Sequence, residues 1–502
     1  MRALEPVQGR IEMNASAARR ALAWCGVRRW ALAVWGGMAL WSAVLFAIVR
    51  SDYLGFRLSR FDLGNMVQAV WSTAHGRPLE MTSPATGEQV ARLAFHVDPI
   101  LVLLTPLWLL VPSPLTLAGA QIVVCALGAL PVFWLGRRHL GSERAAALLA
   151  LAYLAYPWLA WSAVDPIHPV TLAIPLFLFA IWFLDSDRLW AFAVVAVLIA
   201  ATGELMGLSI AALGIWYAIA RGHRRAGAAI ALLGAGWSIV AVKVIVPAFL
   251  DTQSIYYAQY DSVGGSPGGI VRTLFTDPAA IVSKLFSTDN VVYWVWLAVP
   301  LLGLFVLAPW ISAVALPELL VNGLSDRPTM SDPRFHYVAG LLPFLVAGVV
   351  LGLARLSPVH RTRAAAAVLG VSAVTLFAFG PIPGGPTRGS HAAVIPARHV
   401  DALRAAVALV PDRAPVTSTN AVGATLSARR YAYSVPMLGR SEWAVLDMRN
   451  AWMWDGRQGG ATYPERLAAF RVRLARSPSW TKVFDEDDVL VFRRVPEGEG
   501  SG

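Results

Sequence analysis

The sequence predicts a mostly α-helical, polytopic membrane protein with a small soluble α/β domain at its C-terminal end. Of the 502 residues, 57% are hydrophobic and only 15% are charged, whereas an ordinary soluble domain has roughly 25% charged residues. The mean hydropathy is +0.56. Long apolar runs recur up to about residue 380, where the composition changes. Together these observations exclude a soluble enzyme, a disordered chain and a fibrous protein.

The N-terminal segment 1–29 is polar and basic, with arginines at Arg10, Arg19, Arg20, Arg28 and Arg29. Residues 30–49 follow as about 20 apolar residues, which can cross roughly 30 Å of hydrocarbon. A cleaved signal peptide would have a shorter apolar core and a small-residue cleavage site. We therefore expect an uncleaved first span, with its arginine-rich flank in the cytoplasm.

Ten further apolar runs bring the expected number of spans in residues 30–380 to about 11. They lie at roughly 114–136, 145–163, 170–184, 189–202, 206–220, 227–248, 290–308, 310–324, 337–354 and 364–380. The run 99–111 is short and rich in proline, so we expect a re-entrant or interfacial piece there.

The arginines of the loops follow one consistent alternation. Three alternate loops are arginine-rich, with Arg137, Arg138 and Arg144, then Arg221, Arg224 and Arg225, then Arg355, Arg361 and Arg363. The short loops 164–169 and 203–205 carry no Lys or Arg. This satisfies the positive-inside rule with a cytoplasmic N-terminus. Much of the net charge of +11 therefore reflects topology and does not indicate a nucleic-acid partner.

The same topology places the long loops 50–98 and 249–289 outside the cell, together with the C-terminal tail. Residues 381–395 are expected to be a Pro/Gly linker, and residues 396–502 a soluble extracytoplasmic α/β domain. In this domain the pattern predicts helices over 396–410 and 464–476, strands over 416–418, 431–435 and 443–448, and a hairpin of 482–484 with 489–494. Loss of one short span, 189–202 or 310–324, would place the tail on the other side.

The candidate site residues lie in polar segments that this topology places outside. Ionisable groups near the bilayer centre cost about 2.5–3.5 kcal/mol, so they are functional candidates by default. Asp62 follows the first span, at the start of a predicted amphipathic helix on the outer membrane surface. The alternative is that Asp62 only caps this helix. His96 and Asp98 could bind a divalent ion or a phosphate, or cap a helix.

Further candidates come from later loops. Asp165 and His168 occupy a short turn fixed by two prolines, which could equally be an ordinary interfacial turn. Glu204 lies between two short apolar runs. Arg334 and His336 could bind an anionic head group, since arginine offers phosphate a bidentate fork. Lys243, in the seventh span, could serve similarly or extend its ammonium toward the interface. We expect these loops to converge on one outward-facing polar cavity.

Several segments together resemble a known bacterial group. They are FDLGNMVQAVWSTAHGRPL, HVDPILVLLTPL, DPIHPV, TGE, LLVNGLSD, RFHY and VPDRAPVTSTNAVGATLSARRYAYSVP. As a set they resemble the multi-pass membrane family of domain of unknown function 2079 (DUF2079), from about residue 50 to the tail. That family looks related to the GT-C glycosyltransferases, which use polyprenyl-phosphate sugars and carry an acidic residue on a surface helix of the first outer loop. Asp62 matches this position, although Leu63 follows where many relatives have a second acid. His96-Val97-Asp98-Pro99 matches in part a later His-Pro-Pro-Leu-like stretch.

The resemblance implies a membrane glycosyltransferase of the bacterial plasma membrane. It would move a sugar from a polyprenyl-phosphate donor to an extracytoplasmic glycan, lipid or protein acceptor, with Asp62 as the general base. Arg334, with His336 or Lys243, would stabilise the developing charge of the phosphate. The remaining candidates would bind substrate or shape the cavity: His96, Asp98, Asp165, His168 and Glu204. The cofactor stays open; a divalent cation, Mg²⁺ or Mn²⁺, with Asp62, His96 and Asp98 as ligands, is one option.

Two other functions remain open at this point. The first is a transporter or flippase of lipid-linked glycans, which should show internal repeats; the sequence shows none. The second is a non-catalytic scaffold or sensor, with the tail as its partner-binding module. The enzyme hypothesis requires Asp62, His168, Glu204 and Arg334 to surround one pocket. The sugar, the acceptor and the oligomeric state cannot be read from the sequence.

Overall fold

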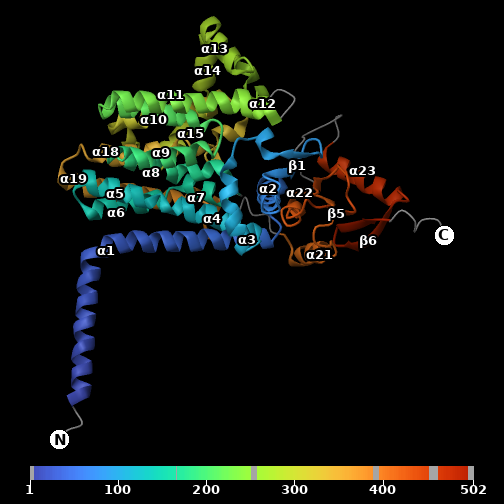
Figure 1. Cartoon of the computed structure of the whole chain (residues 1–502), viewed down its shortest axis with the longest axis horizontal. Coiled ribbons are helices and arrows are strands. Elements are labelled where there is room, and N and C mark those ends of the chain that lie inside the picture. Colours follow the sequence, from blue (N-terminus) through green and yellow to red (C-terminus); the bar gives the residue numbers. More distant parts are fainter. Residues whose placement is uncertain (1–4, 166, 250–256, 388–394, 451–461, 496–502) are drawn as a thin grey trace.

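The chain forms an elongated bundle of helices with a mixed α/β region at one end (Figure 1). This computed structural model describes residues 5–165, 167–249, 257–387, 395–450 and 462–495. The first helix, α1 (Glu5–Leu54), continues from the predicted basic segment through the first apolar run without interruption. Part of the expected linker, residues 388–394, lies outside the described residues, as does Pro166.

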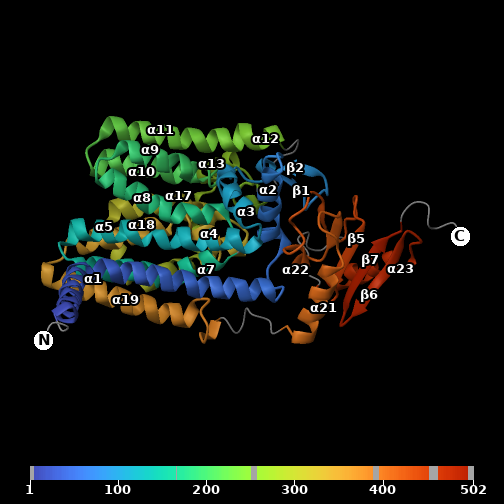
Figure 2. The same cartoon turned by 60° about the horizontal axis from the view of Figure 1, so that its bottom comes forward.

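The bundle consists of α1 and a succession of apolar helices. These are α4 (Pro114–Leu127), α5 (Ala129–Leu140), α6 (Glu143–Leu154), α7 (Pro157–Val164), α8 (Ala173–Asp185), α9 (Leu189–Ala200), α10 (Met206–Ala220), α11 (Arg224–Val240), α12 (Val246–Phe249), α15 (Thr288–Ala298), α16 (Pro309–Ser312), α17 (Leu316–Leu324), α18 (Leu342–Leu353) and α19 (Pro358–Phe379). Many of them run roughly along the long axis of the molecule (Figure 2). Their facing sides form one large apolar core.

Four helical stretches are long and apolar enough to cross a membrane: Arg28–Leu54, Pro114–Leu140, Arg224–Phe249 and Pro358–Phe379. The pair α6 and α7, bent by 48°, would be a fifth. The other apolar helices found in the described ranges have 10–17 residues. The chain is therefore a mostly helical protein with membrane-spanning helices, and the count of about 11 spans stays a prediction.

The prediction of one continuous helix over 290–308 is wrong. Helix α15 ends at Ala298, and the chain then turns through Leu302 and Gly303, whose φ angles are 54° and 63°. Pro300 has no N–H to donate and cannot continue a regular helix. The left-handed pair then reverses the chain, so this apolar run folds as two short helical pieces.

Helices α10 and α11 pack backbone to backbone through glycines. A Cβ on Gly234 would lie 2.6 Å from the carbonyl oxygen of Gly207, and one on Gly214 would lie 2.7 Å from that of Gly227. Small residues at such crossings let two membrane helices approach closely. Each glycine therefore stabilises the helix pair by leaving room for the other helix.

We predict opposite effects for two glycine substitutions in α11. Gly234→Ala should destabilise the α10–α11 pair, because its methyl group meets backbone atoms that cannot move away. Gly236 has open space around its Cβ position, so Gly236→Ala should be neutral or stabilising by up to about 1 kcal/mol through helix propensity. Thermal unfolding of the two purified variants in detergent measures this difference. Equal melting temperatures would contradict the close packing.

The first outer loop folds against protein on both sides. After α1 it forms one π-helical turn, η1 (Arg60–Gly64), and helix α2 (Asn65–Ala74). A hairpin of β1 (Glu80–Thr82) and β2 (Gln89–Ala91) follows, and then the short helix α3 (Thr105–Leu110). Every residue of α2 from Asn65 to Ser72 is buried. The expectation of an amphipathic helix lying on the membrane surface, with Phe61, Met66, Val70 and Trp71, is therefore wrong, because neighbouring protein covers α2.

The C-terminal region contains a five-stranded mixed sheet in the order β4-β3-β5-β7-β6. Its strands are β3 (Val416–Ser418), β4 (Ala432–Ser434), β5 (Trp443–Asp447), β6 (Trp480–Glu486) and β7 (Val489–Arg494), and its helices are α21 (Ala397–Ala408), α22 (Asn420–Gly423) and α23 (Tyr463–Arg476). Strands β6 and β7 pair antiparallel across the acidic turn. Val400, Leu403 and Val410 are buried and pack against the sheet residues Val416, Val445 and Val491.

A buried arginine joins this sheet to the first outer loop. The Arg60 side chain is fully buried and donates hydrogen bonds to Asn65 Oδ1 at 3.2 Å, Ser434 Oγ at 3.1 Å and Thr82 O at 3.3 Å, and to Ala432 O. Burial lowers the pKa of Arg60 to about 10, so it remains charged at neutral pH. Loop and sheet therefore lie at the same end of the bundle (Figure 1).

Two helices of the second long loop project from the bundle. They are α13 (Pro267–Thr276) and α14 (Pro278–Leu285), which lie above α11 in Figure 1. Each begins with proline after a side-chain cap: Ser266 accepts from Gly269 N, and Asp277 accepts from Ala280 N. Proline at the first position suits a helix start, because its missing N–H would have no helical partner there.

Candidate functional site

Asp62 lies in the single turn η1, and the preceding serine holds its carboxylate. Ser59 Oγ donates to Asp62 Oδ2 at 2.7 Å and accepts from the backbone N–H of Asp62. Ser59 is therefore the residue that caps the turn. The Asp62 side chain is 42% exposed, and its Oδ1 lies 3.5 Å from His168 Nε2. The carboxylate is thus partly accessible and fixed in direction.

Three further candidates meet beside Asp62, although they come from loops far apart in the sequence. His168 Nδ1 lies 3.3 Å from Asp165 Oδ2, and His336 Nδ1 lies 3.0 Å from the same oxygen. The rings of His168 and His336 stack with their centroids 3.7 Å apart. We call Asp62, Asp165, His168 and His336 the acid–histidine cluster.

The four groups of the acid–histidine cluster have pKa values shifted in different directions. Burial would raise the pKa of Asp62, but hydrogen bonding and attraction from His168 outweigh it, so the pKa lies below the usual value. Burial raises the pKa of Asp165 to about 7. Burial would lower the pKa of His168, but the neighbouring Asp165 and Asp62 raise it above the usual value. Burial and the nearby His168 hold the pKa of His336 well below the usual value. At neutral pH Asp62 is therefore a carboxylate able to accept a proton.

A second group of charges lies next to the cluster. Glu204 Oε1 lies 3.2 Å from His96 Nδ1, and Glu204 Oε2 accepts from the backbone N–H of Val97 at 3.1 Å. Burial alone would raise the pKa of Glu204, but His96 and these hydrogen bonds lower it to about 2. Asp98 is buried in a bidentate ion pair with Arg92, whose shortest N–O distance is 2.8 Å.

This pairing bears on the expected metal ligands. Both oxygens of Asp98 accept from Arg92, and His96 faces Glu204. Within the described ranges, the one set of His, Cys, Asp or Glu side chains close enough to share an ion is Asp165, His168 and His336. The set Asp62, His96 and Asp98 is therefore corrected, because the nearest partners of His96 and Asp98 are the charged side chains of Glu204 and Arg92.

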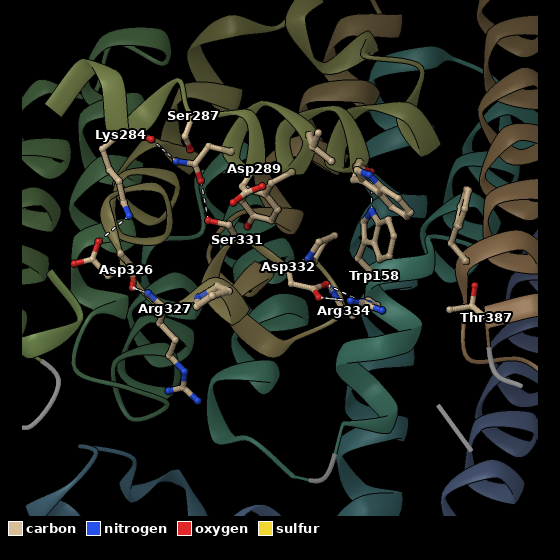
Figure 3. A pocket seen from close by; sticks show the side chains of 18 residues that line it. Trp158, Lys284, Ser287, Asp289, Asp326, Arg327, Ser331, Asp332, Arg334 and Thr387 are labelled. Carbon is tan, nitrogen blue, oxygen red and sulfur yellow. Dashed lines mark hydrogen bonds and ion pairs between the residues drawn. The ribbon is translucent and has the colours of Figure 1, made fainter. Parts of the chain in front are cut away.

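Arg334 lines a cavity of about 600 Å³ (Figure 3). Asp62, His168 and Glu204 are not among its lining residues, so this cavity is not the shared pocket that the enzyme hypothesis requires. It forms a bidentate ion pair with Asp332, with a shortest distance of 2.5 Å, and its side chain is 40% exposed. The cavity wall combines aromatic, amide and charged side chains, including Trp158, Trp296, Asn290, Lys284 and Asp326. Trp158 belongs to α7, which leads into Asp165, so the cavity and the cluster share the same two chain segments.

Lys243 lies apart from these groups. It sits in a π-helical turn, Ala241–Ile245, between α11 and α12, and its side chain is exposed on the outside of the bundle. It does not line the cavity with Arg334. The structure therefore does not bring Lys243 together with Arg334, and an ammonium that extends toward the interface stays the alternative for this residue.

Other polar residues position the site and were missed in the sequence. The buried Gln121 of α4 donates to the carbonyl oxygen of Asp165 at 2.8 Å and accepts from the backbone N–H of His168 at 2.9 Å. Asn420 Oδ1 accepts from the backbone N–H groups of Arg60 and Phe61 at 3.0 and 3.2 Å. An amide inside an apolar run, as at Gln121, is a signal that the sequence did offer.

These features define a mostly helical membrane protein with an acid–histidine cluster at one end of its helices. The chain belongs to the family described as "Predicted membrane protein (DUF2079)", whose family model matches residues 53–463. No curated protein sequence matches it.

Two solved structures share the fold. One is ArnT from Cupriavidus metallidurans bound to undecaprenyl phosphate, with 14% identity and a TM-score of 0.50; the match covers 93% of this chain and 99% of that one. The other is the apo state of the same protein, with 14% identity and a TM-score of 0.53, covering 92% and 98%. At this identity the similarity concerns the fold alone.

Proposed function

We propose that this protein is a membrane glycosyltransferase that moves a sugar from a polyprenyl-phosphate donor to an extracytoplasmic acceptor. The observation that carries the proposal is the placement of Asp62. An ionised carboxylate from the first outer loop meets His168 and His336 from two other loops, at one end of a helical bundle. The same fold occurs in ArnT, whose structure contains undecaprenyl phosphate, which supports a polyprenyl-phosphate partner.

The transfer reaction assigns one role to Asp62. Its carboxylate takes the proton of the acceptor hydroxyl as that oxygen bonds to the anomeric carbon of the sugar. The bond between this carbon and the phosphate oxygen breaks, and polyprenyl phosphate leaves with the bonding electron pair. Direct displacement inverts the anomeric centre. His168 keeps the carboxylate in place through its Nε2.

The cavity that Arg334 lines is suited to a saccharide. Sugars pack on aromatic rings and exchange hydrogen bonds with amides, carboxylates and arginines, and all these groups line the cavity (Figure 3). The lining charges are Lys284, Arg327 and Arg334 against Asp289, Asp326 and Asp332, so they balance formally. In the proposal, Arg334 binds the phosphate at the edge of this cavity.

The proposed reaction requires the first long loop and the C-terminal region to lie on the same side of the membrane. The contact of Arg60 with strand β4 supports a topology in which the first long loop and the C-terminal region lie on one side of the membrane. Because an even number of crossings must then separate them, the proposed count of 11 spans is compatible with this contact. We propose that both lie outside the bacterial plasma membrane, where an acceptor and the head group of the donor are accessible.

We predict that Arg334→Met lowers kcat/KM for the lipid-linked donor by about 10–100-fold, since a hydrogen bond to a charged group contributes about 1.5–3 kcal/mol. Assays of the purified variant at varied donor concentration measure this effect. Arg272→Met, on the exposed surface of α13, is the control and should match the wild type. Equal loss in both variants would exclude a specific role for Arg334.

The proposal as a whole is tested in a deletion strain. Mass spectrometry of its envelope glycans should show one sugar missing, and the wild-type gene should restore it while the Asp62→Asn gene should not. Native mass spectrometry of the purified protein with undecaprenyl phosphate tests the lipid partner separately. Unchanged glycans in the deletion strain, with no lipid bound, would contradict the proposal.

A further inference from the structure

The transfer chemistry leaves Asp165 and His336 without a role, although both face His168. The three side chains place one donor atom each within 4.8 Å of one another. They are between 14% and 17% exposed, so they are shielded and still reachable from one side. We propose that Asp165, His168 and His336 bind a zinc-type transition-metal ion.

The distances between donor atoms fit such an ion. Zinc bonds of about 2.0–2.2 Å to nitrogen and oxygen give a tetrahedral site with edges of about 3.3–3.5 Å. His168 Nδ1 and His336 Nδ1 lie 3.3 and 3.0 Å from Asp165 Oδ2. Two of the three edges are therefore already close to those of a tetrahedron, and all three donor atoms lie within 4.8 Å of one another. The fourth corner is left for water or substrate.

The unpaired nitrogen of His168 is a second, independent observation. Its Nδ1 atom is buried, and although Asp165 Oδ2 lies 3.3 Å away, it makes no hydrogen bond in the described part of the chain. A buried polar atom left unpaired costs about 1–3 kcal/mol, and a metal bond at this atom would remove that cost. His168 Nδ1 and His336 Nδ1 both lie close to Asp165 Oδ2, so the ion would sit between these three atoms.

Asp62 contacts the second ring nitrogen of His168, on the side away from the proposed metal ion. Histidines that bind metals usually direct their second nitrogen to a carboxylate, which fixes the tautomer and the orientation of the ring. His168 Nε2 lies 3.5 Å from Asp62 Oδ1. The chain Asp62, His168 and metal is therefore such a carboxylate–histidine–metal series, and the ion would fix the ring that positions Asp62.

The donor types select the class of metal. Two imidazoles and one carboxylate are typical of zinc sites that keep an open position, whereas Mg²⁺ and Ca²⁺ prefer oxygen ligands alone. Imidazole ligands suit Zn²⁺ and neighbouring transition metals. Because the two rings stack at an interplanar angle of 17°, they must turn apart on binding so that both lone pairs point at one ion.

The test measures metal binding and requires no transfer assay. The full-length protein, purified in detergent through a histidine-free tag and treated with a chelator, is titrated with Zn²⁺ by calorimetry. We expect one equivalent to bind. His336→Gln should weaken binding by at least about 100-fold, because it removes one of three ligands. His96→Gln, which changes a histidine outside the trio, should bind as the wild type does.

X-ray absorption at the zinc edge of the loaded wild-type protein gives a readout that needs no variant. We expect two imidazole ligands and oxygen at about 2.0–2.2 Å. A wild-type protein that binds no zinc, equal affinity in His336→Gln, or a bound zinc without imidazole ligands would each overturn the proposal. Since binding is measured without substrate, failure here leaves the proposed glycosyl transfer standing, and the reverse also holds.

Discussion

Asp62→Asn should reduce sugar transfer by about 10²–10⁴-fold, the usual contribution of a general base. The amide of asparagine keeps the shape of the side chain and its contact with the Ser59 hydroxyl, but it cannot accept the proton of the acceptor. The fold should survive, because the Asp62 side chain is 42% exposed. Membrane insertion and binding of the donor should likewise persist.

To test Asp62, the rate at which the purified variant and the wild-type protein turn over a polyprenyl-phosphate sugar is compared. Donor binding, followed by native mass spectrometry, checks that the variant is otherwise intact. The matched control is Asp52→Asn, which removes an aspartate that pairs with Arg57 at 2.8 Å near the end of α1 and touches no residue of the acid–histidine cluster. Full activity of Asp62→Asn would remove this residue from the mechanism.

Arg60→Met should destabilise the contact between the first outer loop and the C-terminal sheet by about 3–5 kcal/mol. Methionine fills a similar volume but donates no hydrogen bond, so the oxygens of Asn65, Thr82, Ala432 and Ser434 would lose their donor inside the protein. A buried polar group left unpaired costs about 1–3 kcal/mol. Transfer activity should fall as well, since Asp62 lies two residues from Arg60.

Hydrogen exchange locates the effect of Arg60→Met. The amides of β4 and of α2 should exchange faster in the variant, while those of α5, at the end of the bundle opposite the sheet (Figure 1), should not change. Arg471→Met is the control, because Arg471 is exposed on α23; surface changes of this kind usually fall within about 0.5 kcal/mol. Unchanged exchange in β4 would show that Arg60 does not hold the two parts together.

The apolar runs predicted the helices of the bundle well. In a membrane each helix must form its backbone hydrogen bonds within its own segment, so a local run of apolar residues is enough to indicate it. Helices α8, α9, α10 and α11 occupy runs read from composition alone. The prediction failed at α15, where Pro300 and the left-handed Leu302–Gly303 pair end the helix. It also failed at α2, whose apolar side meets protein and not lipid.

The candidate site, like the fold, was predictable in its residues but not in their contacts. Hydrophobicity and charge placement singled out Asp62, Asp165, His168, Glu204 and His336, because ionisable groups stand out against apolar neighbours. Their partners could not be predicted. The sequence offers no rule that pairs His96 with Glu204, Asp98 with Arg92, or Asp165 with His336 across 171 positions.

The sequence by itself therefore determined the apolar helices, the polar segments between them and the identity of the acidic and basic candidates. These are local properties, set by the cost of placing each side chain in water or hydrocarbon. Only the tertiary structure decided which loops meet, that the ion pair of Arg92 with Asp98 removes one candidate metal ligand, and that Lys243 faces outward. Contacts of this kind depend on how the helices pack over the whole chain, and packing is a collective property that no single segment encodes.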